Sequence, residues 1–441
     1  MKTFLAQKYN AFVSAACVLL VPFFLRENQL KVKASKECLK ELERLKNSSA
    51  VILFNHSDRF DPLAVAELSR LAGEGFSYIA SREQFDGFKG VQGWLMQRCG
   101  AYSVLRGEPE DTQSREATIE FIAESNRKLV EFPEGDVTGR DDLILPLKQD
   151  GIRNILAAQQ RLIKKGDDAP VYLLPVAIYY EVQKDGVKAM EICIARLEKR
   201  LGLLQSDLPI AIRVQRLVTN LIFSLESVYG IKAIGDRLDQ RLLSICAQVA
   251  ASIAKVNGLP ANQICDLNNA TIEKVLNHSN PEHAAEEVMV YLHSVRNQLW
   301  RSLKSDRKAS TRSSRFEIQK NELNRYEMKL RSELIPRKQI LFHELDKLEQ
   351  LLILAHSIQQ EVATLNHAWR VIDRLEQEIT GKTTLKGHRI AYIEAGPVLN
   401  LLQFMPAYRG SEKGAVTMVD ESVRQKILAV LNQIKAKHVI A

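Results

Sequence analysis

The feature that most constrains the fold is an alternation of strand-like and helix-like stretches between Ala50 and Glu181. Short apolar runs of the kind that form buried strands lie at Ala50–Phe54, Phe76–Ala80, Tyr102–Leu105, Leu129–Phe132 and Val171–Tyr180. Helical spacing of apolar residues occurs between them, as in Ala117–Asn126 and Ile152–Ile163. Strands that alternate with helices favour a parallel sheet covered by helices. The sequence therefore predicts an α/β domain here.

The composition is that of a soluble or surface-bound globular protein, and 441 residues allow two or three domains. A formal charge of +8 and a pI near 9.0 favour anionic partners, namely nucleic acid, phosphorylated substrates or an acidic membrane face. The sequence has no helix-turn-helix signature, zinc-ligand spacing or aromatic-interleaved basic motif, so nucleic acid is not favoured. The six scattered cysteines form no CxxC pair and are interpreted as reduced thiols in a cytosolic compartment.

A polar loop follows the first predicted strand, with the sequence Asn55-His56-Ser57-Asp58-Arg59-Phe60-Asp61-Pro62. Loops that leave strands commonly carry the chemistry of α/β domains. No other histidine occurs among the first 277 residues, so only His56 can supply an imidazole base to this half of the chain. Asp61 and Pro62 also suit a helix start, as N-cap and first helical residue, and this alternative stays open for Asp61.

Four motifs resemble, in order, those of the glycerolipid acyltransferases, the family that includes lysophosphatidic acid and glycerol-3-phosphate acyltransferases. The Asn-His pair with Asp61 five residues after His56 is similar to the first motif. The later motifs are matched by Gly100–Gly107, Phe132–Gly135 and Leu174–Ile178. Ala80–Phe85 is similar to the Lys-x-Glu-Leu-Phe region that follows the family's first motif. The resemblance covers residues 35–200, and the C-terminal half is not recognised.

Two departures from the family pattern concern the acceptor. The third motif of the family usually continues as Thr-Arg-Ser, whereas Asp136–Arg140 delays the arginine here. The later basic-glycine element is altered to Leu147–Gly151, in which Lys148 can replace one lost charge.

The resemblance implies acyl transfer from acyl-CoA or acyl-carrier protein to a hydroxyl group. His56 is then the general base, and Asp61 is the carboxylate that orients its ring, with Asp58 as an alternative orienter. The residues implied to bind the substrate are Arg106, Glu134, Gly135 and Asn55. The planar fork of arginine suits a phosphate group. No metal or nucleotide cofactor is expected, since the sequence has no GxGxxG, P-loop or GxSxG motif.

Two functions remain open at this point. The first is an O-acyltransferase at the membrane surface, with a lysophosphatidate-like glycerolipid precursor as the leading acceptor and phospholipid precursor synthesis as the pathway. The second is a non-catalytic membrane scaffold that keeps an acyltransferase-like fold while its helical half recruits partners. The intact Asn55-His56 pair and Asp61 favour the enzyme.

Residues 1–30 form an apolar N-terminal segment in which Ala11–Leu25 carries no charge. As a helix this run would reach about 22 Å, short of the ~30 Å hydrocarbon core, so we expect shallow, in-plane membrane contact on the cytoplasmic side. A helix buried against the α/β domain is the alternative. The lysines that follow, which anionic lipid would attract, are Lys31, Lys33, Lys36 and Lys40. Secretion is not favoured, because no small-residue cleavage site follows the apolar run.

The acyltransferase domain is expected over residues 31–235, with a last strand at Lys188–Ala195 and a closing helix at Ile212–Tyr229. A helical region is expected at 236–303, and the polar, basic stretch 304–315 is predicted to be a linker.

Residues 316–441 are predicted to form a long-helix hairpin and a tail. Apolar residues recur every three or four positions from Leu341 to Ile379, so this helix needs a packing partner. An antiparallel helix at Phe316–Leu334 would form the hairpin, and a helical protein partner or a homodimer would satisfy the same face. A final helix is expected at Asp420–Lys437.

Overall fold

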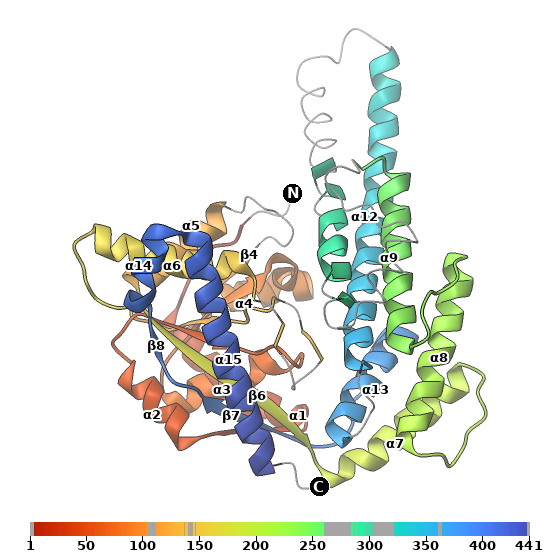
Figure 1. Cartoon of the computed structure of the whole chain (residues 1–441), viewed down its shortest axis with the longest axis horizontal. Helices are drawn as coiled ribbons and strands as arrows, with labels where there is room; N and C mark the ends of the chain where they lie inside the picture. Colours follow the sequence, from red (N-terminus) through yellow and green to blue (C-terminus); the bar gives the residue numbers. More distant parts are fainter. Residues whose placement is uncertain are drawn as a thin grey trace. The chain divides into compact units, whose positions relative to one another are not determined.

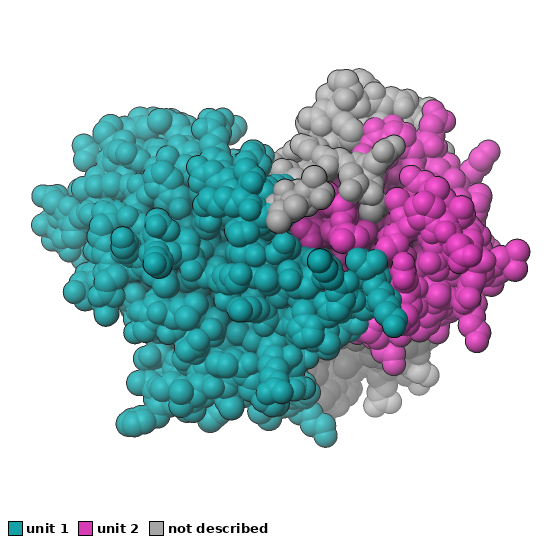
Figure 2. Space-filling model, turned by 90° about the horizontal axis from the view of Figure 1, so that it is seen from below, with its two compact units in different colours: residues 1–106, 110–190, 385–441 teal, residues 107–109, 191–384 magenta. Residues whose placement is uncertain are grey.

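The structure is a computed structural model of the chain (Figure 1). It describes residues 4–104, 112–135, 137–139, 144–145, 147–259, 284–285, 287–296, 298–299, 301–302, 322–359 and 364–438; the side chains of Glu83 and of residues 322–339 are not described. The chain divides into two compact units, shown in different colours in Figure 2. Unit 1 comprises residues 1–106, 110–190 and 385–441, and unit 2 comprises residues 107–109 and 191–384. Unit 1 is therefore assembled from segments that lie on both sides of unit 2 in the sequence.

Unit 1 is built on a mixed sheet of eight strands among the described residues. In chain order these are β1 Leu30–Ala34, β2 Ala50–Phe54, β3 Ser77–Ser81, β4 Ala101–Val104, β5 Leu129–Glu131, β6 Tyr172–Val182, β7 Arg389–Ala395 and β8 Leu399–Asn400. Across the sheet the order is β1-β7-β6-β2-β5-β3-β4, with β8 beside β6. All pairs are parallel except β6 with β7 and β6 with β8. The predicted α/β fold and the five strands predicted between Ala50 and Tyr180 are confirmed, with ends that differ by at most two residues.

Both faces of this sheet are covered by helices, which explains why β2 is apolar throughout. Its side chains alternate between two cores: Val51 and Leu53 join one, whereas Ala50, Ile52 and Phe54 join the other. The first core includes residues of α5 Thr112–Glu124, α6 Gln149–Lys164, α14 Met405–Gly410 and α15 Glu412–His438. The second includes residues of α1 Ala11–Glu27, α2 Lys36–Arg44 and α3 Asp61–Ala72. A short segment, η1 Arg82–Gly90 and α4 Val91–Arg98, connects β3 to β4, and η3 Leu401–Phe404 precedes α14.

Strand β7 corrects the prediction that residues 316–441 are only a helical hairpin and tail. It lies between β1 and β6, in parallel register with β1 and antiparallel register with β6. Its sequence, Arg-Ile-Ala-Tyr-Ile-Glu-Ala, has the β-branched and aromatic content of a strand and is bounded by Gly387 and Gly396. The final helix is confirmed, but α15 begins at Glu412, eight residues before the predicted start.

Unit 2 is helical in its described part, and its long helices are α8 Ile210–Tyr229, α9 Leu238–Val256, α12 Glu322–Ser357 and α13 Leu365–Thr380. Helix α12 packs on α9 and α13, and α8 packs on α9 and α13. Helix α7, Lys184–Arg200, begins in unit 1 and continues into unit 2. Within unit 2, Arg213 on α8 forms a two-bonded ion pair with the buried Glu198 of α7, at 2.7 and 3.0 Å.

Two local predictions for this region are wrong. The strand expected at Lys188–Ala195 is part of α7, because Met190, Cys193, Ile194 and Leu197 are buried at helical spacing. The expected hairpin partner at Phe316–Leu334 is not a separate helix, since its residues from Glu322 onward belong to α12. The apolar pattern from Leu341 to Ile379 instead spans α12 and α13, which pack on each other. The predicted linker, 304–315, lies outside the described residues.

Candidate active site

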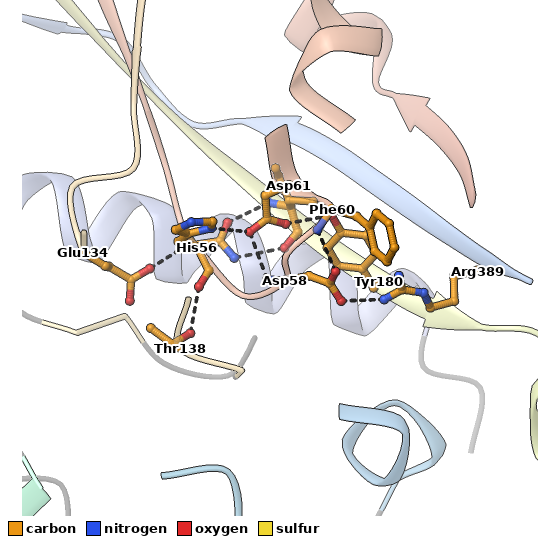
Figure 3. Close-up of polar contacts among 10 residues, drawn as sticks. His56, Asp58, Phe60, Asp61, Glu134, Thr138, Tyr180 and Arg389 are labelled. Carbon is orange, nitrogen blue, oxygen red and sulfur yellow. Dashed lines mark hydrogen bonds and ion pairs between the residues drawn. The ribbon is translucent and has the colours of Figure 1, made fainter. Parts of the chain in front are cut away.

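His56 lies in the loop between β2 and α3, where both its backbone and its ring make polar contacts (Figure 3). The His56 N–H donates to Glu134 Oε1 at 2.7 Å. The His56 carbonyl accepts from the Thr138 N–H at 2.7 Å and from the Thr138 hydroxyl at 3.1 Å. The segment that follows β5 therefore fixes the position of the His56 backbone, from which the imidazole extends.

The His56 ring contacts the carboxylate that the sequence singled out. His56 Nδ1 lies 2.8 Å from Asp61 Oδ2, and the Asp61 side chain is fully buried, whereas the His56 side chain is 14% exposed. The same carboxylate accepts from the Asp58 N–H at 3.0 Å and from the Tyr180 hydroxyl at 2.7 Å. Phe60 is the N-cap of α3 and Asp61 is its first helical residue, so the capping alternative for Asp61 is not adopted.

The contact with Asp61 determines which ring nitrogen of His56 is available to a substrate. An ionised carboxylate accepts hydrogen bonds only, so Nδ1 carries the proton that Asp61 accepts. In the neutral imidazole the lone pair is then on Nε2. Phe132 stacks on the ring, with 4.4 Å between centroids and 28° between planes, which limits its rotation. Nε2 is therefore the atom that can take a proton from a substrate.

Burial shifts the pKa values of the ionisable groups around the His56–Asp61 pair. Burial raises the pKa of Asp61, and the hydrogen bond and charge of His56 oppose that rise. Burial, together with the nearby charges of Asp61 and Asp58, raises the pKa of Tyr180 well above its usual range. Tyr180 therefore stays protonated and acts as a hydrogen-bond donor.

Glu134 was predicted to bind substrate, but both of its carboxylate oxygens are used within the protein. Oε1 accepts from His56 as described, and Oε2 accepts from the Leu145 N–H at 2.9 Å. Burial raises the pKa of Glu134 to about 7, although the N–H groups of His56 and Leu145 oppose the rise. Glu134 therefore joins the loop that carries His56 to the segment that precedes α6.

Gly135 is required by its backbone conformation and by a close neighbour. Its φ of +79° lies in the left-handed region, which other residues adopt only with strain. A Cβ atom at this position would lie 2.2 Å from Lys148 Cε and 2.3 Å from Lys148 Nζ. The end of the Lys148 side chain thus passes directly over the Phe-Pro-Glu-Gly turn.

Of the other two residues predicted to bind substrate, Asn55 makes hydrogen bonds within the protein and Arg106 lies outside the described residues. The Asn55 side chain is buried and makes two hydrogen bonds to the backbone of Ile178, donating to its carbonyl at 3.0 Å and accepting from its N–H at 2.8 Å. Asn55 therefore ties the loop to β6.

Two further side chains, which the sequence did not indicate, contact the aspartates of the His56 loop. Tyr180, near the end of β6, donates to Asp61, and Arg389 of β7 forms an ion pair with Asp58 Oδ2 at 2.5 Å (Figure 3). Tyr180 lies two residues after the fourth motif, a signal that could have indicated it. No local pattern connects Arg389 with a loop 331 residues earlier. Among the described residues, no group of three or more His, Cys, Asp or Glu side chains is placed to hold a metal ion.

Comparison with known families agrees with this geometry. Residues 36–179 match the family model described as Acyltransferase. This part of the chain is an acyltransferase domain. The match runs from the start of α2 into β6 and includes His56, Asp61 and Glu134. It supports acyltransferase activity in general and the resemblance to the glycerolipid acyltransferases.

The acyltransferase domain as matched covers about a third of the chain. Residues 191–384 of unit 2 and strand β7 lie outside the match. No curated protein matches the chain.

Proposed function

We propose that this chain is an O-acyltransferase that moves a fatty acyl group from acyl-CoA or acyl-carrier protein to a hydroxyl of a glycerolipid precursor. The observation that carries the proposal is the His56–Asp61 pair, in which a buried carboxylate holds Nδ1 and leaves Nε2 to accept a proton. A scaffold without catalytic activity has no need of this arrangement. The enzyme is therefore the better reading of the site.

The proposed reaction needs no covalent enzyme intermediate. His56 Nε2 takes the proton of the acceptor hydroxyl as its oxygen attacks the thioester carbonyl carbon, which contributes typically 10²–10⁴-fold. Asp61 stabilises the imidazolium that forms, as the carboxylate of a Ser-His-Asp triad does. The tetrahedral intermediate then breaks its carbon–sulfur bond, and the thiolate leaves as the free carrier thiol once it takes up a proton from the imidazolium. The acyl donor is a co-substrate, and the chemistry needs no resident cofactor.

A lysophosphatidate-like acceptor is the leading candidate. The strong positive charge of the chain favours an anionic substrate. The Lys148 ammonium lies over the Gly135 turn, next to the residue that positions the His56 backbone. We assign Lys148, together with Arg106, to the acceptor phosphate.

We also propose that the enzyme works at the cytoplasmic face of a membrane. No described helix is both long and apolar enough to span a bilayer. Helix α1 nevertheless exposes several large apolar side chains, and so does the η1–α4 segment, whose helix α4 packs on α1. The exposed residues are Phe12, Leu19, Leu20, Phe23, Phe24, Phe88, Val91 and Trp94. The two segments are joined where the N–H groups of Lys8 and Asn10 donate to the carbonyls of Gln97 and Arg98. Exposed apolar side chains on two segments that contact each other suit in-plane lipid contact.

The proposal is tested with the purified full chain and a panel of lyso-lipid acceptors, each offered with acyl-CoA and with acyl-carrier protein. Products are identified by mass spectrometry. We expect acylated product with a lysophosphatidate acceptor, dependent on one of the two donors. If no acceptor is acylated from either donor by the folded protein, the proposed function is wrong and the scaffold is favoured.

A further inference from the structure

The loop that carries His56 contains a second buried carboxylate, Asp58, which the proposed chemistry does not use. Asp58 Oδ2 pairs with Arg389 Nη1 at 2.5 Å, and Asp58 Oδ1 accepts from the Phe60 N–H at 2.9 Å. Both charged side chains are at most 5% exposed. Arg389 is the first residue of β7 and comes from the far end of the chain. This ion pair therefore joins the catalytic loop to a strand outside the acyltransferase match.

Asp58 and Arg389 depend on each other electrostatically. Burial by itself favours the protonated form of Asp58, but the charge and hydrogen bond of Arg389, with the Phe60 N–H, outweigh it and hold the pKa of Asp58 below its ordinary value. Removing one member of a buried pair leaves the other charge without compensation. The rings of Phe60 and Tyr180 lie 5.2 and 5.0 Å from the guanidinium, which adds cation–π contacts.

The Asp58–Arg389 pair is connected to His56, the proposed base, through one further residue, Asp61. The Asp58 N–H donates to Asp61 Oδ2, the same oxygen that contacts His56 Nδ1. Tyr180, which flanks Arg389, donates to the other oxygen of Asp61. Movement of Asp58 would therefore change the donors that orient Asp61, and through Asp61 the His56 ring (Figure 3).

We propose that Arg389 is a positioning residue for acyl transfer, and that it acts through Asp58 to hold Asp61 and His56 in place. The active site is then completed by strand β7, which follows unit 2 in the sequence. This inference rests on the proposed function, in which His56 is the base. Arginine suits the position because its planar fork can donate to a carboxylate while its face lies against aromatic rings, which a lysine ammonium cannot reproduce.

The test uses the full chain with the variants Arg389→Gln, Arg389→Lys, Asp58→Asn and the double variant Asp58→Asn/Arg389→Gln. Glu74→Gln is the matched control, because it makes the same carboxylate-to-amide change opposite another buried cation of unit 1, Lys128, at 2.8 Å. Glu74 follows the end of α3 that is opposite to Asp61, roughly 18 Å along the helix. Each variant is checked for folding by circular dichroism.

Two readouts are taken. The first is kcat and the donor KM for transfer from palmitoyl-CoA to lysophosphatidate. The second is the ring signal of His56 in nitrogen-15 histidine NMR spectra, assigned by its loss in His56→Gln. The second readout does not depend on the identity of the acceptor.

We expect Arg389→Gln and Asp58→Asn each to lower kcat by about 10- to 100-fold, with little change in donor KM, because displacement of a catalytic group by about 1 Å has effects of this size. The double variant should be no worse than Arg389→Gln, since both changes remove one contact, and Arg389→Lys should recover part of the rate. The His56 signal should shift in these variants and stay unchanged in Glu74→Gln.

Wild-type kcat and an unchanged His56 signal in folded Asp58→Asn would overturn the inference, as would equal losses in Glu74→Gln. If Arg389→Gln does not fold, Asp58→Asn alone decides, since it keeps Arg389 and the shape of the loop. If the wild type acylates no acceptor but its His56 signal responds to Asp58→Asn and not to Glu74→Gln, the positioning role stands and the proposed function fails.

Discussion

Replacing Gly135 with alanine moves Lys148 without removing its charge. A Cβ at this position would lie 2.2 Å from Lys148 Cε and 2.3 Å from Nζ, whereas non-bonded heavy atoms normally approach to about 3.5 Å. The end of the lysine side chain must therefore move by more than about 1 Å. The side chain is flexible at this end, so we expect the movement itself to cost little stability. The backbone strain at a φ of +79° adds about 1–2 kcal/mol.

Gly166→Ala provides the matched control. Gly166 has a φ of +81°, and no atom lies within 4 Å of its hypothetical Cβ. It should therefore suffer the same backbone strain without displacing a side chain. Both variants should lower the melting temperature by a few degrees, at about 2–4 °C per kcal/mol for a unit of this size.

Only Gly135→Ala should change how the acceptor binds. A charge-assisted contact contributes about 1.5–3 kcal/mol, so partial loss of the Lys148 contact should raise the KM for lysophosphatidate about 10-fold. The KM for monoacylglycerol, which lacks the phosphate, should not change. If the two variants have the same KM values for both acceptors while both remain folded, Lys148 does not bind the phosphate.

Three further predictions follow from other parts of the structure. A chain ending after Tyr229 should not fold as unit 1, because it lacks β7 between β1 and β6. Cooperative thermal unfolding of that truncated chain would contradict the prediction. By contrast, an internal deletion that joins Met190 to Leu385 by a short linker should fold, since the backbones of Gly186 and Gly387 are in contact. Replacing the exposed Phe12 and Phe23 with serine should reduce sedimentation with anionic vesicles and leave a salt-sensitive remainder, and undiminished binding in high salt would exclude the apolar surface of α1. The pKa of about 7 for the buried Glu134 is above that of the unfolded chain, so its contribution to stability is greatest below about pH 4.3 and is lost as the pH rises towards 7. Glu134→Gln should therefore flatten part of that decline in thermal unfolding, with Glu131, whose pKa burial also raises to about 7, causing the rest; an unchanged slope would show that Glu134 does not titrate in this range.

The central pair was predictable because it is local. His56 and Asp61 are five residues apart, and a loop between a buried strand and an amphipathic helix leaves their side chains few positions. The buried strands were also predictable, since β2 and β6 are apolar runs with turn-forming or polar residues at their ends. The roles of Asn55 and Glu134 were not predictable, because the same residue types can bind substrate or satisfy backbone groups, and only the folded loop shows the latter.

The contribution of the C-terminus could not be predicted for a different reason. The sequence of β7 carries a strand pattern, but the pattern does not say which sheet it joins, and the pairing with β1 and β6 depends on contacts hundreds of residues apart. The contact of Arg389 with Asp58 can be recognised only once β7 is placed beside β6. Helix α7 was misread as a strand because a short apolar segment fits either period until its longer spacing is considered.

The most direct test of the account is the turnover of His56→Ala. If His56 is the general base, kcat for acyl transfer should fall by ~10²-fold or more while donor binding changes little, because the lost interaction is made mainly in the transition state. Donor binding is measured separately by calorimetry, and folding by circular dichroism. A folded His56→Ala protein that transfers the acyl group at the wild-type rate would contradict the mechanism.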